Sequence, residues 1–491
     1  MKVCYHRIAT LKTPEAFLEE LNHLGLQIPF DYTVVPSPVG ALSRPFFLSD
    51  GFKIGNRFCV QPMEGWDGTR DGKPTEFTIR RWKHFGLSGA KLIWGGEAFA
   101  VRPDGRANPN QLMILEETKS AIEDLRIALV DEHRNHNGDT SDLLVGMQLT
   151  HSGRFSKPND KTRFEPRILY HHPLLEKMYH TPPDTPIMTD MEVEELIEDY
   201  VKAAKRAEDI GFDFVDIKHC HGYLGHEFLS ALTRDGHYGG SFKNRTRFLC
   251  EIVRGVQRDC PNLRIGVRLS MFDTPPFRPD ENNIGYMIDY RDRKGCYPFA
   301  FGGDPEMPGE IKLDETIEFL KLAEEIGVQL INLTAASPYY NHHLTRPAFF
   351  PPSDGYDAPE DPLVGVARHI EVAAKLKREI PDMACVGSAY SYLQEWIPNV
   401  AQSVIRLGMI DFVGLGRSML SYPELPSDVL AGNELDRKKI CRTFSDCTTA
   451  PRKGMISGCY PLDEYYKNLP EADELKLIKI NIKKNKIKGP R

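Results

Sequence analysis

The chain has 491 residues, a formal net charge of −7, 41% hydrophobic residues and 27% charged residues. This balance is that of a soluble globule with a large core; it shows no basic excess for nucleic acid, no bilayer-spanning apolar run and no signal peptide. Ten cysteines are too few for a secreted disulfide scaffold, so we expect a cytoplasmic protein that binds neither membranes nor nucleic acid.

The chain opens with an expected N-terminal arm, residues 1–45, that holds a short helix in TPEAFLEELNHLG. Eight short, nearly continuously apolar runs follow, as expected for parallel strands buried on both faces. Four of them come directly after a glycine that can close a helix, at Gly89, Gly211, Gly327 and Gly408. The eight runs are Arg57–Gln61, 90–96, Leu143–Gln148, 212–218, Leu263–Leu269, 328–334, Met383–Val386 and 409–416.

Amphipathic segments between these runs predict helices. The clearest begins at Thr189, where Glu192 three residues later makes a capping-box pattern. The others span 241–259, 314–326, 361–380 and 391–407. Eight strands alternating with helices predict an α/β protein, a (β/α)8 TIM barrel over residues 46–435. A doubly wound sheet is disfavoured, because no G-x-G-x-x-G follows the first strand.

Two further regions lie outside the alternation. Residues 272–312 form a long insertion after the fifth strand, rich in proline and aromatic residues. We expect it to cover the barrel mouth as a lid, the alternative being a plain surface excursion. We expect Tyr290, Tyr297, Phe299 and Phe301 of this insertion to form an apolar wall of the substrate cavity. Residues 436–491 form a C-terminal extension whose Lys-rich end we interpret as a solvated tail; an anionic partner is the alternative.

Catalytic groups of a barrel lie at the carboxyl ends of its strands and in the loops that follow. The glycines after strands 7 and 8, with Arg417, indicate a phosphate site. The Gln148 amide suits the edge of a heterocycle, and the Arg268 guanidinium can stabilise an anionic ring. Together these residues predict a bound phosphorylated heterocycle.

Five collinear segments over about residues 45–430 closely resemble the Old Yellow Enzyme family of FMN-dependent ene-reductases. They are NRFCVQPMEG, GMQLTHSGR, IGVRLS, DFVGLGRSMLSYPEL and the long, specific HGYLGHEFLSALTRDGHYGGSFKNRTRFLCEIV. The resemblance implies an FMN-binding barrel that reduces the C=C bond of a small α,β-unsaturated carbonyl compound with NADH or NADPH. It also implies a set of flavin contacts: Pro62, Met63, Gly96, Glu97, Gln148 and Arg268 at the ring, and Gly387, Ser388, Gly416 and Arg417 at the phosphate.

For the substrate, the resemblance implies that Lys218 and His221 bind the carbonyl oxygen and that Tyr223 protonates the alkene carbon. Lys218 departs from the family, which usually has His there, and His219 should point to the other side of the strand. A lysine can stabilise a developing enolate and can favour an anionic substrate. The structural alternative is that Lys218 pairs with Glu97 or another acid.

The sequence argues against two possible metal sites. His219, His221 and His226 belong to a segment that matches a non-metal family motif, so we predict no metal there. Cys441, Cys447 and Cys459 stand where some relatives carry four cysteines for a [4Fe–4S] cluster. The close C-x-x-C pair is missing, so such a cluster would lack a ligand and ordinary thiols are expected.

Other functions remain open at this point. A flavin-dependent demethylase or desaturase would use the same scaffold, and a flavin-binding protein with a decayed substrate site would explain the Lys218 departure. The sequence leaves open the physiological substrate, the choice between NADH and NADPH, and the oligomeric state, for which a homo-oligomer is one alternative.

Overall fold

The structure, a computed structural model, describes residues 5–487. Eight parallel strands close into a barrel, and the last of them pairs with the first. They are β3 (Phe58–Val60), β4 (Leu92–Ile93), β6 (Leu144–Thr150), β7 (Phe214–Ile217), β8 (Arg264–Ser270), β11 (Leu330–Thr334), β12 (Ala384–Gly387) and β13 (Phe412–Leu415). Each overlaps one of the eight predicted runs, and β6, β8 and β12 extend one or two residues past theirs, so the (β/α)8 barrel is confirmed; a short β5 (Ala98–Ala100) also pairs with β6.

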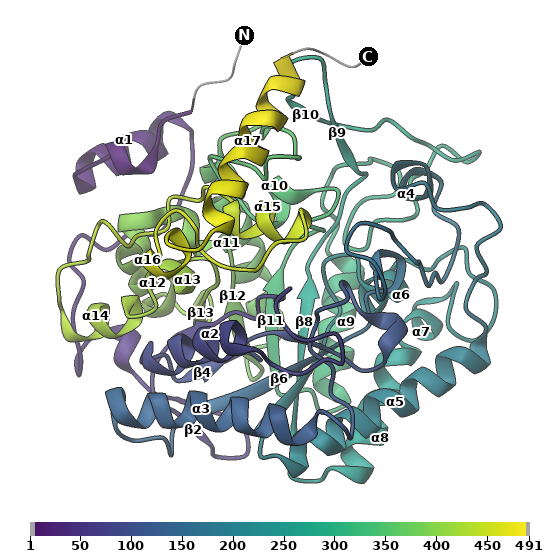
Figure 1. The fold of residues 1–491 in the computed structure, drawn as a ribbon, viewed down its shortest axis with the longest axis horizontal. Helices are drawn as coiled ribbons and strands as arrows, with labels where there is room; N and C mark the ends of the chain where they lie inside the picture. Colours follow the sequence, from purple (N-terminus) through teal and green to yellow (C-terminus); the bar gives the residue numbers. More distant parts are fainter. Residues whose placement is uncertain (1–4, 488–491) are drawn as a thin grey trace.

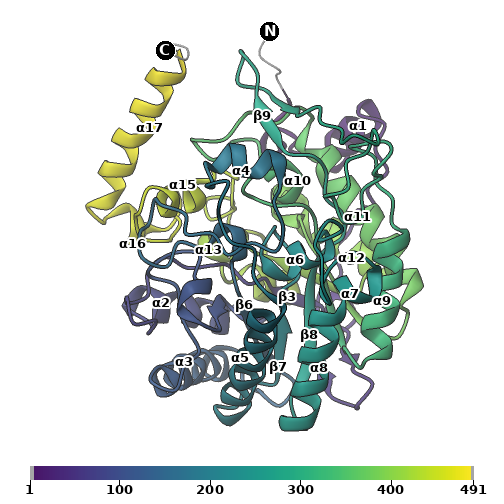
Figure 2. The ribbon, with the colours of Figure 1, turned by 90° about the vertical axis from the view of Figure 1, so that its right-hand side faces the viewer.

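Helices surround the strands on the outside (Figures 1 and 2). The long ones are α2 (Glu76–Leu87), α3 (Lys119–Asn137), α5 (Asp190–Asp209), α8 (Arg247–Asp259), α9 (Asp314–Glu325), α11 (Pro362–Glu379) and α12 (Ile397–Arg406). The capping box at the start of α5 is present, because Thr189 Oγ1 accepts from the Glu192 amide and Glu192 Oε2 accepts from the Thr189 amide. The helix predicted over 391–407 is broken: Gln394 has a φ of 54°, so a 3-10 turn (Tyr390–Trp396) precedes α12.

Shorter elements connect these parts. They are β1 (Phe46–Phe47), β2 (Lys53–Ile54), α4 (Pro173–Tyr179), α6 (Leu224–Leu229), α7 (Phe242–Arg245), β9 (Phe277–Pro279), β10 (Gly285–Met287), α10 (His342–Thr345), α13 (Ser418–Ser421) and α14 (Leu425–Ala431). In the described part of the chain, no helix is both long and apolar enough to span a membrane.

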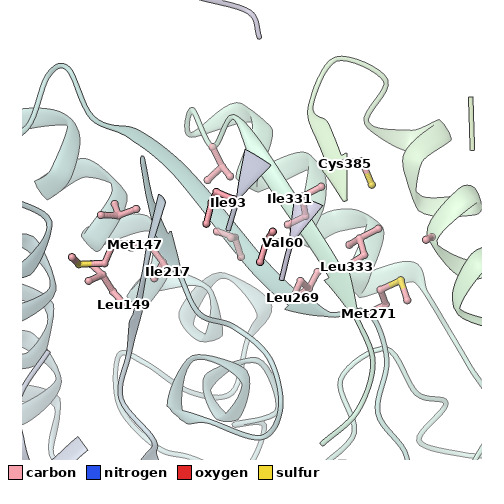
Figure 3. Close-up of a cluster of buried hydrophobic side chains, with 14 of the residues drawn as sticks. Val60, Ile93, Met147, Leu149, Ile217, Leu269, Met271, Ile331, Leu333 and Cys385 are labelled. Carbon is pink, nitrogen blue, oxygen red and sulfur yellow. The ribbon is translucent and has the colours of Figure 1, made fainter. Parts of the chain in front are cut away.

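Side chains alternate between the two faces of each barrel strand. On β7, Phe214 belongs to a small apolar cluster inside the barrel, whereas Val215 and Ile217 belong to the large core between strands and helices. Figure 3 shows part of that outer core, including Met147 and Ile217. The same period of two places Asp216 and Lys218 on the inner face with Phe214, toward the carboxyl end of the strand.

The terminal segments pack onto the barrel. The N-terminal helix α1 (Pro14–His23) contacts the 3-10 turn before α12 through Phe17, whose ring stacks on Trp396 with centroids 5.5 Å apart. The C-terminal extension forms α15 (Asp446–Arg452), α16 (Glu464–Lys467) and α17 (Glu471–Ile487). The predicted solvated tail is thus helical as far as residue 487, and residues 488–491 lie outside the described part. Figures 1 and 2 both show α15 and α17 at the same end of the molecule as β9 and α4.

Candidate active site

A cavity of about 270 Å³ opens at the carboxyl ends of the barrel strands. It brings together most of the site residues predicted from the sequence: Pro62, Met63, Gln148, Lys218, His221, Tyr223, Arg268, Ser388, Gly416 and Arg417. Gly96, Glu97 and Gly387 are not part of its lining. The cavity therefore joins residues from six strand ends that are far apart in the chain.

A buried carboxylate that the sequence reasoning missed organises the floor of this cavity. Asp216 Oδ2 accepts hydrogen bonds from Gln148 Nε2 at 2.6 Å and Trp94 Nε1 at 2.7 Å, and Oδ1 accepts from the Arg268 amide at 2.6 Å. Burial raises the pKa of Asp216, and these donors oppose that rise. Because the Gln148 NH₂ group is held by Asp216, its carbonyl oxygen remains to accept from a ligand N–H.

Two guanidinium groups in the lining have buried nitrogens without partners. Arg268 donates from Nη1 to the Pro62 carbonyl at 3.2 Å, and its Nε has no hydrogen-bond partner. Arg417 donates from Nη2 to the Pro347 carbonyl at 2.8 Å, and its Nη1 is likewise unpaired. A buried unpaired donor is costly, so both point to an acceptor that a ligand supplies. A flavin ring oxygen and a phosphate satisfy these needs, and the residues present fit FMN.

Arg346, in the long connection after β11, was also missed. It lines the cavity, donates to Thr448 Oγ1 and has an unpaired buried Nε. Burial and the neighbouring charge of Arg417 lower its pKa to about 9. Arg346 and Arg417 are both partly buried and their charges oppose each other, so together they favour a multiply charged anion.

The three residues predicted to act on substrate share one corner of the cavity with Glu64. Tyr223 donates its hydroxyl to Glu64 Oε2 at 2.6 Å and also contacts the Tyr339 hydroxyl at 2.8 Å. Lys218 Nζ lies 3.9 Å from the same Glu64 oxygen and 4.0 Å from the centroid of the Tyr223 ring. Burial is the main cause that raises the pKa of Tyr223 and lowers that of Lys218, and Glu64 opposes the change at Lys218. Tyr223 is therefore protonated at neutral pH.

His221 completes this corner. It follows β7 with a φ of 67°, and its Nε2 lies 3.4 Å from Thr334 Oγ1. Burial, followed by the charge of Arg268, holds its pKa well below the usual range, so the imidazole is neutral. His219 points outward, as predicted, where its ring packs between Phe248 and Phe319.

Glu97 faces a different partner. Its carboxylate pairs with Arg81, which also binds Asp67 Oδ2 at 2.6 Å. Gly96 lies beneath the Trp82 ring, and its carbonyl accepts from the Met63 amide at 2.9 Å. The partner of Lys218 is thus Glu64, and Glu97 is occupied by Arg81.

The cover of the cavity comes from an unexpected part of the chain. Cys447, Thr448, Pro451, Arg452, Ser457 and Gly458 of the C-terminal extension line it, together with Pro338 and Tyr339 after β11. The insertion 272–312 contributes no lining residue. Its aromatic side chains pack elsewhere, with Phe299 on Tyr170, Tyr297 on His172 and Phe301 on Phe319. The apolar wall expected from the insertion is therefore absent from this cavity.

His226 and the adjacent Glu227, considered as metal ligands, have other partners. His226 Nδ1 accepts from the Gly222 amide at 2.9 Å, and Glu227 pairs with Arg154 at 2.9 Å. Within residues 5–487, no group of three or more His, Cys, Asp or Glu side chains is arranged to hold a metal ion.

Comparison with known proteins places this chain in a family. Residues 41–284 match the model of the NADH:flavin oxidoreductase / NADH oxidase family. The chain is 33% identical over 387 residues to the NADPH dehydrogenase of Bacillus subtilis (strain 168), an alignment that covers 78% of this chain and 92% of that enzyme. It is 29% identical over 387 residues to the NADPH dehydrogenase of Geobacillus sp. (strain WCH70), with 77% and 90% covered.

Solved structures share the fold at lower identity. An old yellow enzyme homologue from Zymomonas mobilis superposes with a TM-score of 0.54 at 20% identity, over 80% of this chain and 94% of that one. A 2-naphthoyl-CoA reductase superposes with a TM-score of 0.62 at 18% identity, over 89% of this chain, which spans 58% of that reductase. The chain therefore belongs to the NADH:flavin oxidoreductase family, the Old Yellow Enzyme family, and is an NAD(P)H-dependent flavin oxidoreductase that uses FMN.

Proposed function

We propose that the protein is an ene-reductase that reduces the C=C bond of small α,β-unsaturated carbonyl compounds. The observation that carries this proposal is the corner formed by Lys218, His221 and Tyr223 in the cavity that also holds the partnerless guanidinium nitrogens. A cation and a neutral N–H beside a protonated phenol provide what the reduction of an enone needs at its oxygen and its α-carbon.

The cofactor has a matching set of groups in this chain. We propose that Arg417 and Arg346 hold its phosphate with Ser388 and the open backbone of Gly416, where an added Cβ would meet nothing closer than 3.7 Å. Gln148 and Arg268, both positioned by Asp216, are proposed to bind the ring edge. Bound FMN supplies the hydride that goes to the β-carbon of the alkene.

Side chains of the protein stabilise the charge on the carbonyl oxygen and supply the proton. Lys218 and His221 donate to the carbonyl oxygen and stabilise the negative charge that develops there. Tyr223 turns its hydroxyl from Glu64 to the α-carbon and gives up the proton, and Tyr339 stands next to it to replace that proton. The ammonium of Lys218 over the Tyr223 ring stabilises the phenolate that results.

Steady-state product analysis tests this function. With NADPH or NADH, purified protein is expected to convert 2-cyclohexenone to cyclohexanone. A flavin demethylase or desaturase would instead consume an amine or a saturated ketone without NAD(P)H. Turnover of those donors together with inert enones would contradict the proposal.

Arg417→Ala is expected to weaken FMN binding roughly ten- to hundredfold, because it removes a charge-assisted contact to the phosphate. Arg346→Ala should have a similar effect. The measurement is the ratio of flavin to protein absorbance after dialysis, with Arg437→Ala, a half-exposed surface arginine, as the control. Heat denaturation should release FMN; release of FAD, or full occupancy in Arg417→Ala, would count against the assignment.

Glu64→Gln is expected to shift the pH dependence of enone reduction. Burial lowers the pKa of Lys218 and the Glu64 charge raises it, so removing that charge lowers the pKa further. Lysine is active as a cation below its pKa, so the alkaline fall in kcat/KM for the enone should move to lower pH. Glu64 also raises the pKa of Tyr223, so the shift in a Lys218→Met background, which reports Tyr223 alone, should be smaller. An unchanged alkaline limb would show that Lys218 is not the titrating group.

A cytoplasmic location and a homo-oligomeric state stay predictions. Gel filtration coupled to light scattering gives the oligomeric state directly.

A further inference from the structure

One buried cation of the cavity, Lys157, has no hydrogen-bond or salt-bridge partner among the described residues. Lys157 follows the short turn after β6, lines the cavity and is 7% exposed. Its Nζ lies 4.5 Å from the Trp66 ring centroid and 4.9 Å from that of Phe164. Among the side chains that the structure describes, neither a carboxylate nor a hydrogen-bond acceptor reaches this ammonium group.

The other cations of the lining are matched. Lys218 faces Glu64, Arg81 faces Asp67 and Glu97, and Arg452 binds Asp354 Oδ1 at 3.1 Å. The phosphate and ring of FMN are assigned to Arg346, Arg417 and Arg268. Lys157 is then the one lining cation, within the described residues, that remains without an anion.

Burying an ammonium group without a hydrogen-bond partner costs free energy. Burial lowers the pKa of Lys157 to about 8; the charges of Glu64, Asp354 and Asp160 raise it, and that of Arg452 lowers it. A desolvated, unpaired ammonium inside a binding cavity is typical of a group whose partner arrives with the ligand. The ammonium lies near the Trp66 and Phe164 rings, and these cation–π contacts leave its hydrogen-bond donors free for a ligand.

We propose that Lys157 binds a carboxylate of the substrate, so that the preferred substrates are unsaturated carbonyl compounds bearing a carboxylate away from the reacting bond. This inference rests on the proposed ene-reductase function. The competing anion is the 2′-phosphate of NADPH, which lies at the far end of the dinucleotide from the nicotinamide. Phe164, whose ring centroid lies 4.9 Å from the Lys157 ammonium, packs against the buried cluster that contains Tyr223, so Lys157 belongs to the reacting end of the cavity.

Ligand binding to the FMN-loaded enzyme tests this without turnover. The probes are 4-hydroxybenzoate and 4-hydroxybenzamide, which share a phenol for Lys218 and His221 and differ in one charge. Calorimetric titration of the wild type should give a dissociation constant about ten- to hundredfold lower for the carboxylate, the worth of a charge-assisted hydrogen bond. Lys157→Met, which keeps an apolar stem against Trp66, should abolish that preference and leave the amide affinity unchanged. Lys157→Arg should restore it.

Controls separate the remaining explanations. Lys161→Met removes a nearby lysine that bonds the Gly454 carbonyl and does not line the cavity, and it should leave both affinities unchanged. Equal affinity of the wild type for the two probes, or equal loss of both in Lys157→Met, would overturn the proposal. So would slower flavin reduction by NADPH, but not NADH, in Lys157→Met, because the partner would then be the 2′-phosphate.

Kinetics connect the subsite to the reaction. With a carboxymethyl-substituted 2-cyclohexenone and its carboxamide, Lys157→Met should raise KM for the acid alone and spare kcat for both. If the wild type reduces neither compound, the ene-reductase function fails, and the binding preference still decides the carboxylate subsite.

Discussion

Tyr223→Phe is expected to slow the reoxidation of the reduced enzyme by an enone roughly 10²–10⁴-fold, the usual worth of a positioned acid. Reduction by NAD(P)H requires no proton on an alkene carbon, so that half-reaction should keep its rate. The phenol is placed for proton transfer, with Glu64 at 2.6 Å and Tyr339 at 2.8 Å from its oxygen. Stopped-flow traces of the two half-reactions provide the measurement.

Tyr339→Phe is the matched control. It removes a hydroxyl from the same cavity but leaves Tyr223 its bond to Glu64, so its effect on reoxidation should be much smaller than that of Tyr223→Phe. If Tyr223→Phe slows both half-reactions equally, Tyr223 positions the flavin and is not the proton donor. A larger effect from Tyr339→Phe would make Tyr339 the acid.

Lys218→Met is expected to slow reoxidation by an enone roughly 10²–10³-fold, because one donor to a developing oxyanion is lost in a dry site. It should also weaken the binding of phenols. Lys218 is 5% exposed and its charge lies 3.9 Å from Glu64, so removal of the cation also leaves that carboxylate less compensated. His221→Ala should weaken phenol binding as well, through loss of its neutral N–H.

Lys218→His separates two explanations of this unusual lysine. If the lysine only supplies a donor to the carbonyl oxygen, the histidine variant should reduce neutral and anionic enones alike. If it also selects an anionic group, the variant should keep the neutral enones and lose the anionic ones. Unaltered kinetics of both substrate types in Lys218→Met would remove Lys218 from the mechanism and leave it a structural partner of Glu64.

The barrel was predictable because its signals are local. Short apolar runs after helix-closing glycines mark the strands, and the capping box at Thr189 marks the start of α5. The period of two along a strand also predicted that His219 turns away from Lys218. The same rule applied two residues earlier would have found Asp216, a charged residue on the inner face between Phe214 and Lys218.

The cover of the site could not be predicted in this way. Arg346 meets Thr448 across 102 residues of sequence, and the Trp66 amide bonds Ser457 Oγ across 391. No periodic pattern encodes such contacts. The insertion was misjudged for a related reason: aromatic composition predicts burial, but it does not say against which surface Tyr297 and Phe299 pack. The alternative that Lys218 pairs with Glu97 or another acid could not choose Glu64 over Glu97, because the competition from Arg81 is not visible in the sequence.

The most direct test of the proposed function is the visible spectrum of the purified protein under anaerobic conditions. We predict a yellow protein whose flavin absorbance is bleached by NADPH or NADH and returns in full when one equivalent of 2-cyclohexenone is added. A protein that NAD(P)H bleaches but that no enone restores would contradict the ene-reductase assignment of Lys218, His221 and Tyr223.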